Sequence, residues 1–357
     1  MMNTQFNMAA PIRIHALRCR VKITHTLKQC KRSLSFAVNR KSQPKDDFES
    51  KQTHFGYESI PEHDKEERVY EVFKNVAGSY DLMNDAMSMG VHRVWKDQFI
   101  NKLAPHPGTQ LLDVAGGTGD IAFRFLKYSK SLEKRNGTSN TESDDGSDFD
   151  LTKDISAQAF GIPEHYMEDP YLSTSESSSD SSEEEDDSKV TPPKTHVTVC
   201  DINKEMLEVG KARAVEMGLV EGLSWVQGNA ESLSFEDNLF DAYTIAFGIR
   251  NCTHIDKVVE EAYRVLKPGG RFMCLEFSQV SNPLLRSVYD NYSFQVIPVM
   301  GQVLARDWKS YQYLVESIRQ FPDQEEFSSL IRKSGFKMVT YENLTFGVAA
   351  IHSGFKL

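Results

Sequence analysis

The apolar residues of this chain follow two alternating spacings, which predict repeated strand–helix units. Short and almost continuous apolar runs, typical of strands buried on both faces of a sheet, occur at 110–114, 196–200, 223–227, 240–247 and 271–276. Between these runs, apolar residues recur every three or four positions, as on one face of a helix. Strands that alternate with helices favour a mostly parallel sheet covered on both faces. The pattern therefore predicts an α/β fold.

The segments on either side of these units are mostly helical. Apolar residues recur at helical spacing from 65 to 100, and again over much of 284–334. The breaker Lys267-Pro268-Gly269-Gly270 is expected to end a helix just before the fifth strand. At the carboxyl end, 336–341 and 347–352 indicate a closing hairpin.

Three glycines follow the first predicted strand directly. In the run L-L-D-V-A-G-G-T-G-D, Gly116, Gly117 and Gly119 separate this strand from a helical segment. Glycines allow a tight turn and let a ligand approach the backbone closely. Strand, glycine turn and helix form the opening unit of nucleotide-binding α/β folds, with Asp113 at the strand end facing the same crevice. A glycine turn in an ordinary α/β domain is the alternative interpretation.

Two later strand ends carry groups that suit a nucleoside. Asp201 ends the second strand, where a carboxylate can accept hydrogen bonds from both ribose hydroxyls, and Asn229-Ala230 ends the third, where an adenine edge would lie. The alternatives are a helix N-cap for Asp201 and a plain turn for Asn229. A dehydrogenase would need G-x-G-x-x-G, and Ala122 stands where its third glycine belongs.

Charge is segregated along the 357 residues, so the formal net charge of −10 hides two contrasting segments. Residues 1–45 hold ten basic side chains and no acidic one, which is typical of a mitochondrial transit peptide; a basic tail that binds nucleic acid or lipid is the alternative. Residues 129–195 hold 17 acidic against six basic side chains and predict a disordered insertion. We expect a linker at 46–65 and a folded domain at 66–357, interrupted by this insertion.

Composition disfavours several classes of protein. The chain outside the two segments is still acidic, which disfavours nucleic-acid binding. Its five cysteines include no C-x-x-C pair, and its histidines lack paired zinc spacing, so we expect a reducing compartment and no metal site. No run of 18 apolar residues occurs, so no spanning helix is expected.

One stretch of the N-terminal helices, Y-D-L-M-N-D-A-M-S-M-G-V-H-R-V-W from Tyr80, is dense in polar and aromatic residues. It contains four different proton-handling side chains, those of Tyr80, Asp81, Asn84 and His92. The alternative is a helix pair that packs on the sheet, and for Trp95 we expect such a core position.

Two long stretches, Tyr80–Trp95 and Arg264–Ser278, resemble the signatures of the quinone-biosynthesis C-methyltransferases. F-G-I-R-N from Phe247 and Y-E-N-L-T from Tyr341 resemble the same family, and together the likeness covers almost everything outside the leader and the acidic segment. The resemblance implies a class I S-adenosylmethionine-dependent methyltransferase domain. Its fold would be Rossmann-like, with a mostly parallel seven-stranded sheet and an antiparallel closing strand.

The resemblance also implies S-adenosylmethionine as methyl donor, with contacts from Thr118 and from the strand-end residues named above. The expected cofactor site comprises Gly117, Thr118, Gly119, Asp201, Asn229 and Ala230. Bacterial members tend to have a serine where this chain has Ala246, so we assign no cofactor contact there.

The implied reaction is C-methylation of a reduced polyprenyl methoxy-benzoquinol in ubiquinone synthesis; bacterial relatives also methylate demethylmenaquinol. A ring carbon is a weak nucleophile unless a ring hydroxyl loses its proton, so the chain must stabilise a phenolate. Arg250, after the fourth strand, is the first candidate for this role or for orienting a water, since arginine stays protonated; a surface ion pair is its alternative. Asn251 is expected to position the quinol, and His92 or Asp81 to act as base.

A polyprenyl tail must leave the site toward a membrane. Tyr80 and Asn84 are expected to contact the substrate, and apolar residues between 284 and 304 to form a lid and tail channel, with core or dimer packing as the alternative. With the leader, the resemblance implies a peripheral protein on the matrix side of the mitochondrial inner membrane. It also implies membership of a multi-subunit coenzyme Q biosynthetic complex; a homodimer is a further expectation.

Two other functions compete with this one. A small-molecule O-methyltransferase would share the cofactor half but needs a different acceptor pocket, which the Y-D-x-M-N segment disfavours. A non-catalytic scaffold would not bind S-adenosylmethionine, whereas the glycine turn and Asp201 favour binding.

Overall fold

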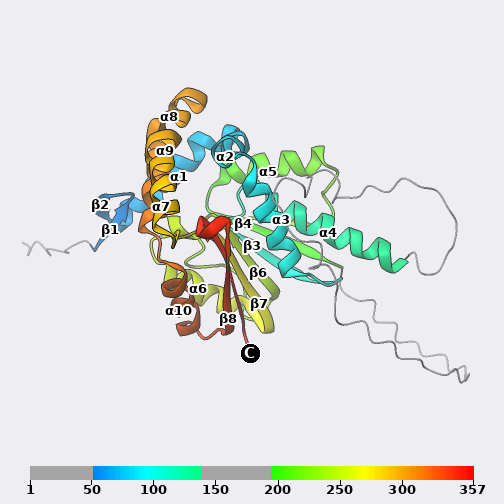
Figure 1. Ribbon diagram of the computed structural model, residues 1–357. Helices are drawn as coiled ribbons and strands as arrows, with labels where there is room; N and C mark the ends of the chain where they lie inside the picture. The colour runs from blue at the N-terminus through cyan, green and yellow to red at the C-terminus, as the bar shows by residue number, and fades with distance from the viewer. Residues whose placement is uncertain (1–50, 138–193) are drawn as a thin grey trace, which may run out of the picture. The chain divides into compact units, whose positions relative to one another are not determined.

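Seven strands form one sheet in the part of the chain that the computed structural model describes, residues 51–137 and 194–357 (Figure 1). They are β3 (Gln110–Val114), β4 (His196–Asp201), β5 (Leu223–Gln227), β6 (Phe240–Ala246), β7 (Leu266–Phe277), β8 (Lys337–Leu344) and β9 (Ala349–Phe355). Their order in the sheet is β5-β4-β3-β6-β7-β9-β8. The first five in this order run parallel, and β9 lies antiparallel to both β7 and β8. The predicted α/β class, with its antiparallel closing strand, is confirmed.

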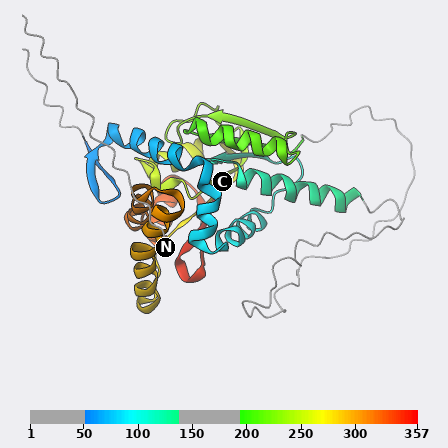
Figure 2. The same cartoon turned by 90° about the horizontal axis from the view of Figure 1, so that it is seen from above.

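Helices cover both faces of this sheet (Figures 1 and 2). They are α3 (Val91–Leu103), α4 (Asp120–Gly137) and α5 (Lys204–Glu216) on one face, and α6 (Ile255–Val265) and α10 (Gln324–Lys333) on the other. Successive strand residues point to opposite faces. Leu111 of β3 accordingly belongs to the core cluster that contains Phe99 and Phe125, whereas Leu112 belongs to the cluster that contains Val259. This two-sided burial explains the almost continuous apolar runs of the strands.

A further helical group lies beyond the carboxyl ends of the parallel strands (Figure 1). It comprises α1 (Glu62–Val76), η1 (Ala77–Ser79), α2 (Tyr80–Ser88), α7 (Pro283–Asn291), η6 (Tyr292–Val296), α8 (Ile297–Met300), η7 (Gly301–Ala305) and α9 (Trp308–Gln320). Met83 of α2, Ile297 of α8 and Val315 of α9 share a core cluster of their own. Segments 200 residues apart in the sequence therefore form one cap over the sheet.

The structure differs from the predicted linker at 46–65. Residues 51–61 form a hairpin of β1 (Gln52–Phe55) and β2 (Glu58–Pro61), followed at once by α1. Its few apolar side chains pack on distant elements: the ring of Phe55 stacks on Tyr313 of α9 with centroids 4.2 Å apart, and Ile60 is buried. Such contacts leave no periodic signal in a short polar segment.

Two other boundaries also differ from their predictions. The Lys267–Gly270 breaker ends α6 as expected but lies inside β7, where the register shifts between the Phe240–Leu266 and Ala242–Arg271 pairs. The predicted insertion at 129–195 begins later than expected, because α4 continues to Gly137. The predicted leader at 1–45 and most of the predicted insertion lie outside the described residues. Within the described ranges, no helix is both long and apolar enough to cross a membrane.

The direction in which the strands are added reverses between β3 and β6, which is where open α/β sheets bind ligands. The turns that leave these two strands pack tightly. Ala115 has a φ of +50°, and a Cβ at Gly248 would lie 2.4 Å from the Cβ of Ala115. A side chain at position 248 therefore does not fit beside the methyl group of Ala115.

We expect Gly248→Ala to lower the free energy of unfolding by about 1–3 kcal/mol, because the added methyl group overpacks the junction. Ala115→Gly should restore it in the double variant, since glycine removes the clash and tolerates the positive φ. Urea unfolding measures both. Gly78→Ala is the matched control, because a Cβ there meets nothing within 4 Å. Equal stabilities of the Gly248→Ala and wild-type proteins would contradict this packing.

Candidate active site

The site has two parts. One is the carboxyl ends of β3, β4 and β5, where open α/β sheets form a ligand crevice, and the other is an apolar cavity under the helical cap. In the crevice, the turn after β3 reverses through Gly117 and Gly119, whose φ angles of +54° and +83° favour glycine. Asp113 lies fully buried beneath this turn; its Oδ1 accepts a hydrogen bond from the Thr244 hydroxyl, and burial raises its pKa to about 7. The glycine turn therefore forms one side of the crevice.

Asp201 closes the crevice from the end of β4. Its Oδ2 accepts a hydrogen bond from the Gly117 backbone at 2.9 Å and its Oδ1 accepts one from the Asn203 backbone at 2.8 Å. Desolvation raises the pKa of this carboxyl group to about 6, although these backbone donors oppose the shift. The N-cap of α5 is Asn203, whose side chain accepts from Met206, so the structure does not give the capping role to Asp201.

The other three predicted cofactor residues, Thr118, Asn229 and Ala230, lie at the same strand ends. Asn229 follows β5; its amide oxygen accepts from the Glu231 backbone and its nitrogen donates to Glu66 at 3.2 Å, while Ala230 beside it is buried. The buried Thr118 hydroxyl accepts from Arg213 Nη1 at 2.9 Å. Arg213 was not predicted as a site residue, because a basic residue on a helix carries no sequence signal for a contact with Thr118.

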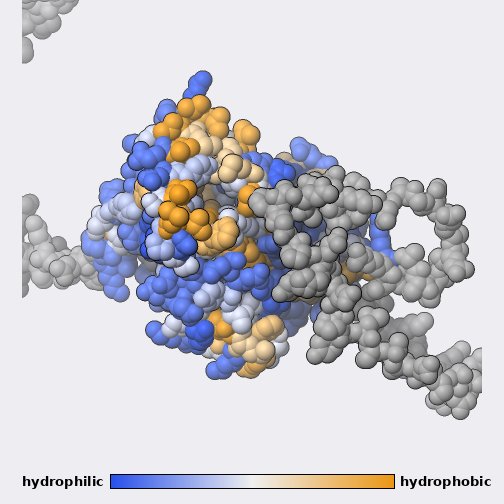
Figure 3. Space-filling model, in the orientation of Figure 1, coloured by the Kyte–Doolittle hydropathy of each residue, from blue (hydrophilic) through white to orange (hydrophobic). Residues whose placement is uncertain are grey.

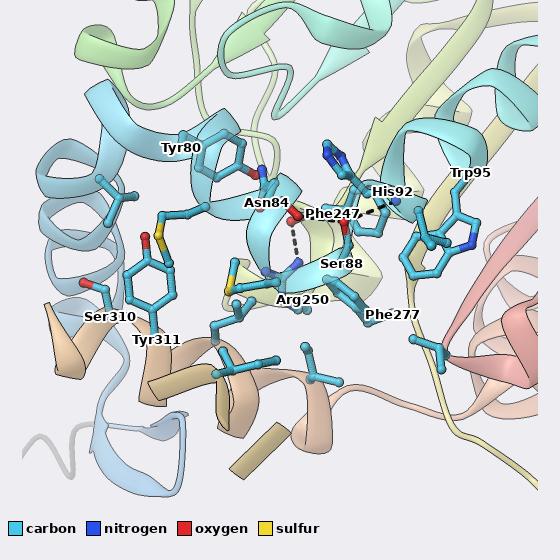
Figure 4. A pocket seen from close by; sticks show the side chains of 18 of the residues that line it. Tyr80, Asn84, Ser88, His92, Trp95, Phe247, Arg250, Phe277, Ser310 and Tyr311 are labelled. Atoms are coloured by element: carbon cyan, nitrogen blue, oxygen red, sulfur yellow. Dashed lines mark hydrogen bonds between the residues drawn. The ribbon is translucent and has the colours of Figure 1, made fainter. Parts of the chain in front are cut away.

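The apolar cavity has a volume of about 260 Å³ (Figure 4). Phe247 on its lining directly precedes Gly248, which packs on Ala115 in the turn after β3. The cavity walls come from α1, α2 and α3 on one side and from α7, α8 and α9 on the other, with the residues that follow β6 and the end of β7 completing it. Its lining is mainly aromatic, methionine and aliphatic side chains, interrupted by a few polar groups. Four predicted site residues lie on it: Tyr80, Asn84, His92 and Arg250.

Two of the predicted catalytic and substrate residues, Asp81 and Asn251, lie outside the cavity lining. Asp81 forms an ion pair with Arg213 at 2.6 Å, so its carboxylate already neutralises a neighbouring cation. Asn251 is buried behind Arg250, and its side-chain oxygen accepts from the Tyr313 hydroxyl at 3.0 Å. Both are close to the site, but neither faces the cavity.

Two cationic side chains line the cavity, Lys96, whose Nζ is paired with Asp120 at 2.7 Å, and Arg250. The candidate for phenolate stabilisation is Arg250. It is 6% exposed, and its Nη1 donates to Glu276 Oε1 at 2.9 Å and to the Phe247 carbonyl at 2.5 Å. The guanidinium also lies 5.4 Å from the centroid of the Phe277 ring. The surface ion pair that we weighed for Arg250 is thus a buried one. Its partner Glu276 was not predicted, although an acid at the end of an apolar strand is a usable signal.

Two polar side chains of α2 approach this cation. Burial raises the pKa of Tyr80, and the charge of Arg250 and a hydrogen bond with Asn84 oppose that shift. Tyr80 is therefore a neutral hydroxyl beside a fixed positive charge. Figure 4 shows Tyr80 and Asn84 on the same helical wall, with Arg250 among the groups that face them.

His92 lies farther along this wall on α3. Its Nε2 is 2.8 Å from Asp85 Oδ1. Burial, followed by the charge of Lys96, lowers the pKa of His92, and Asp85 acts in the opposite direction. Its ring is therefore neutral at neutral pH. Asp85 was not singled out from the sequence, although it lies in the segment that was.

The crevice suits a nucleoside-bearing ligand. A carboxylate has about four lone-pair sites, so Asp201 can still accept from a ribose hydroxyl beside its backbone donors, which are Gly117, Ile202 and Asn203. Sheet order, closing strand, glycine turn and this carboxylate together define a class I S-adenosylmethionine-dependent methyltransferase.

The comparison with known families agrees with this class. The model of the ubiE/COQ5 methyltransferase family matches residues 62–356, and the chain belongs to this family. It is thus a methyltransferase that uses S-adenosylmethionine as methyl donor.

Similar curated proteins cover most of the chain. A Danio rerio protein is 51% identical over 98% of this chain and 100% of its own length. A Bos taurus protein is 56% identical over 87% of this chain and 85% of its own, and a Homo sapiens protein is 55% identical over 86% and 85%. All three are named mitochondrial 2-methoxy-6-polyprenyl-1,4-benzoquinol methylase.

We expect the affinity for S-adenosylmethionine to fall as the pH drops below about 6, because protonated Asp201 loses the charge that strengthens its bonds to the ribose hydroxyls. Asp201→Asn should bind about 10- to 100-fold more weakly at pH 8 and lose this pH dependence. Calorimetry from pH 5 to 8 measures both. Glu208→Gln, an exposed acid of α5, is the control. A wild-type affinity that is constant over this range would contradict the role of Asp201.

Proposed function

We propose that this methyltransferase methylates a ring carbon of a reduced polyprenyl methoxy-benzoquinol in ubiquinone biosynthesis. One observation carries the proposal: a buried arginine faces an apolar, aromatic-lined cavity next to the cofactor crevice. The names of the relatives support the same substrate class. S-adenosylmethionine, when bound, supplies an electrophilic methyl group; the chain must make the acceptor ring nucleophilic.

Arg250 stabilises the phenolate form of the ring. Its guanidinium stays protonated, and the cavity excludes much of the water that would screen its charge. Glu276 and the Phe247 carbonyl hold it in one orientation before the substrate arrives. A preorganised cation costs little reorganisation as negative charge develops on the ring oxygen.

The remaining polar groups orient the ring and handle its proton. Tyr80 and Asn84 donate hydrogen bonds to ring oxygens from the opposite wall, and neutral His92 is the base that receives the hydroxyl proton. The aromatic walls hold the ring in place, and positioning of this kind lowers a barrier by about 7–11 kcal/mol. Asp81 and Asn251 act one step removed, by fixing Arg213 and Tyr313 respectively.

We expect Arg250→Gln to lower kcat by about 10²- to 10³-fold without changing the affinity for S-adenosylmethionine, because the developing charge loses its cation. The single variant leaves Glu276 buried without its partner, which destabilises the fold. The double variant Arg250→Gln/Glu276→Gln removes both charges and should recover stability but not activity. Single-turnover assays with a short-tail quinol, with mass spectrometry of the product, provide the measurement. Wild-type turnover of the double variant, or a methyl group on oxygen, would contradict the proposal.

We further propose that the protein binds the matrix face of the mitochondrial inner membrane peripherally. The elements that line the cavity also carry exposed apolar side chains on their outer face, visible at the top of Figure 3. This apolar ridge consists of Leu284, Val288, Val299, Val303, Leu304 and Trp308. Exposed Arg286, Arg306 and Lys309 lie within the same segment, which suits an anionic lipid surface although the chain as a whole is acidic.

This arrangement gives a polyprenyl tail a short route to lipid. Ile297 lines the cavity from α8, while Val299 and Val303, a few residues later, are exposed. The predicted lid thus has an inner and an outer apolar face. We also propose that the protein belongs to a multi-subunit coenzyme Q biosynthetic complex and forms a homodimer. The apolar ridge is the surface that a partner protein or a second copy of this chain would contact.

We expect Leu284→Glu/Val303→Glu to bind at least tenfold more weakly to vesicles of phosphatidylcholine and cardiolipin, because each substitution places a charge where an apolar side chain, 75% and 72% exposed, would insert. Vesicle co-sedimentation measures this. Val215→Glu, 68% exposed on α5, is the control. Failure of the wild-type protein to bind vesicles would contradict direct membrane contact.

A further inference from the structure

A hydrogen-bonded trio links the end of α2 to the start of α3. His92 Nε2 is 2.8 Å from Asp85 Oδ1, which also accepts from Arg93 Nε at 2.7 Å. Asp85 Oδ2 accepts from Arg93 Nη2 at 2.5 Å. Arg93 thus holds the carboxylate at both oxygens, in the bidentate geometry that fixes its plane.

The charges of this trio determine which ring nitrogen of His92 carries the proton. The hydrogen bonds from Arg93 lower the pKa of Asp85 to about 2, so this carboxylate is ionised and acts only as an acceptor. A neutral imidazole has one N–H, and the nitrogen that faces an acceptor must be the one that bears it. Nε2 therefore carries the hydrogen, and Nδ1 carries a lone pair.

That lone pair is unused in the described structure. His92 is 7% exposed, and its Nδ1 is buried without a hydrogen-bond partner among the described residues. A buried polar atom left unpaired is costly, and a ligand in an adjoining cavity can supply the missing partner. The ring itself lines the apolar cavity, where the substrate is the group that can supply a hydrogen.

We propose that Asp85, which Arg93 orients, is a positioning residue that holds His92 as its Nε2–H tautomer, so that Nδ1 takes the proton of the substrate's ring hydroxyl. The inference rests on the proposed function. The O–H bond breaks, an N–H bond forms at Nδ1, and the electron pair stays on the ring oxygen beside Arg250. Asp85 stabilises the resulting imidazolium. After the ring carbon has lost its own hydrogen to water as a proton, Nδ1 returns its proton to the ring oxygen.

Other charged groups near His92 act on the same equilibrium. Lys96, on its own helix, disfavours the imidazolium, whereas Asp85 of α2 and Asp120 at the start of α4 favour it. Lys96 Nζ is itself paired with Asp120 at 2.7 Å, which limits the net effect of both. Asp85 is thus the charge in direct contact with the ring.

The trio could also serve merely to fasten α2 to α3, and Asp85→Asn separates the two roles. An amide at this position can donate to Nε2, which would move the ring hydrogen to Nδ1 and remove the base. We expect kcat to fall at least about 100-fold. Without the base, the variant depends on quinol that has already ionised in solution, so its remaining activity should rise steadily from pH 6 to 9. The wild-type rate should reach a plateau within this range. Asp85→Glu should restore much of the rate.

A second measurement is independent of turnover. In protein labelled with ¹⁵N-histidine, the His92 signals, identified by their loss in His92→Gln, should show hydrogen on Nε2 in the wild type and on Nδ1 in Asp85→Asn. Arg93→Gln should leave the tautomer unchanged and reduce kcat less than Asp85→Asn. Asp97→Asn, which breaks another α3 ion pair with an arginine, is the matched control and should leave kcat and the pH profile unchanged.

An Nδ1–H signal in the wild type would overturn the proposal, and so would an Asp85→Asn enzyme with the wild-type pH profile. The two tests also distinguish this proposal from the proposed function. If the wild type methylates no quinol at a ring carbon but the tautomer switches as expected, the proposed function fails while the positioning by Asp85 stands.

Discussion

The buried pair of Arg250 and Glu276 is the interaction on which the site depends. Removing two charges from water is expensive, and such a pair adds little to stability compared with apolar packing. What the pair provides is a cation held at a known position in a largely apolar cavity. The strand end of β7 supplies Glu276 and the turn after β6 supplies Arg250, so the position of the cation is determined by the neighbouring strands of the sheet. The position of the cation that we propose for catalysis therefore depends on the packing of the sheet.

The two parts of the site differ in the sign of their buried charges. On the crevice side, Asp113 and Asp201 are acids whose pKa values burial raises, to about 7 and about 6, and the carboxylate of Asp201 is available to polar hydroxyls. On the cavity side, the fixed charge is positive and the surroundings are apolar. A polar nucleoside and an apolar ring with a polyprenyl tail would thus each meet the matching half. Arg213 lies at the border, bound to Thr118 on one side and Asp81 on the other.

Much of the fold and part of the site could be predicted from the sequence, for identifiable reasons. The strands are buried on both faces and the helices on one, so their periodicities differ and are legible locally. The glycine turn and Asp201 were predictable because they directly follow strands whose carboxyl ends must meet. By contrast, the hairpin at 51–61 depends on Phe55 reaching Tyr313, and the role of Glu276 depends on Arg250, which faces it from the turn after β6. These contacts join residues far apart in the chain and leave no periodic trace.

The sequence by itself determined the α/β class, the order of the strand–helix units, the glycine turn and the candidate residues of the segment from Tyr80 to His92. The tertiary structure decided which candidates share a cavity: Tyr80, Asn84, His92 and Arg250 do, whereas Asp81 and Asn251 are turned to other partners. It also decided that Asp85 and Arg93 hold His92. The physical reason is that propensity and periodicity act between near neighbours in the chain. Burial, pairing and pKa depend instead on which distant segments close over a side chain.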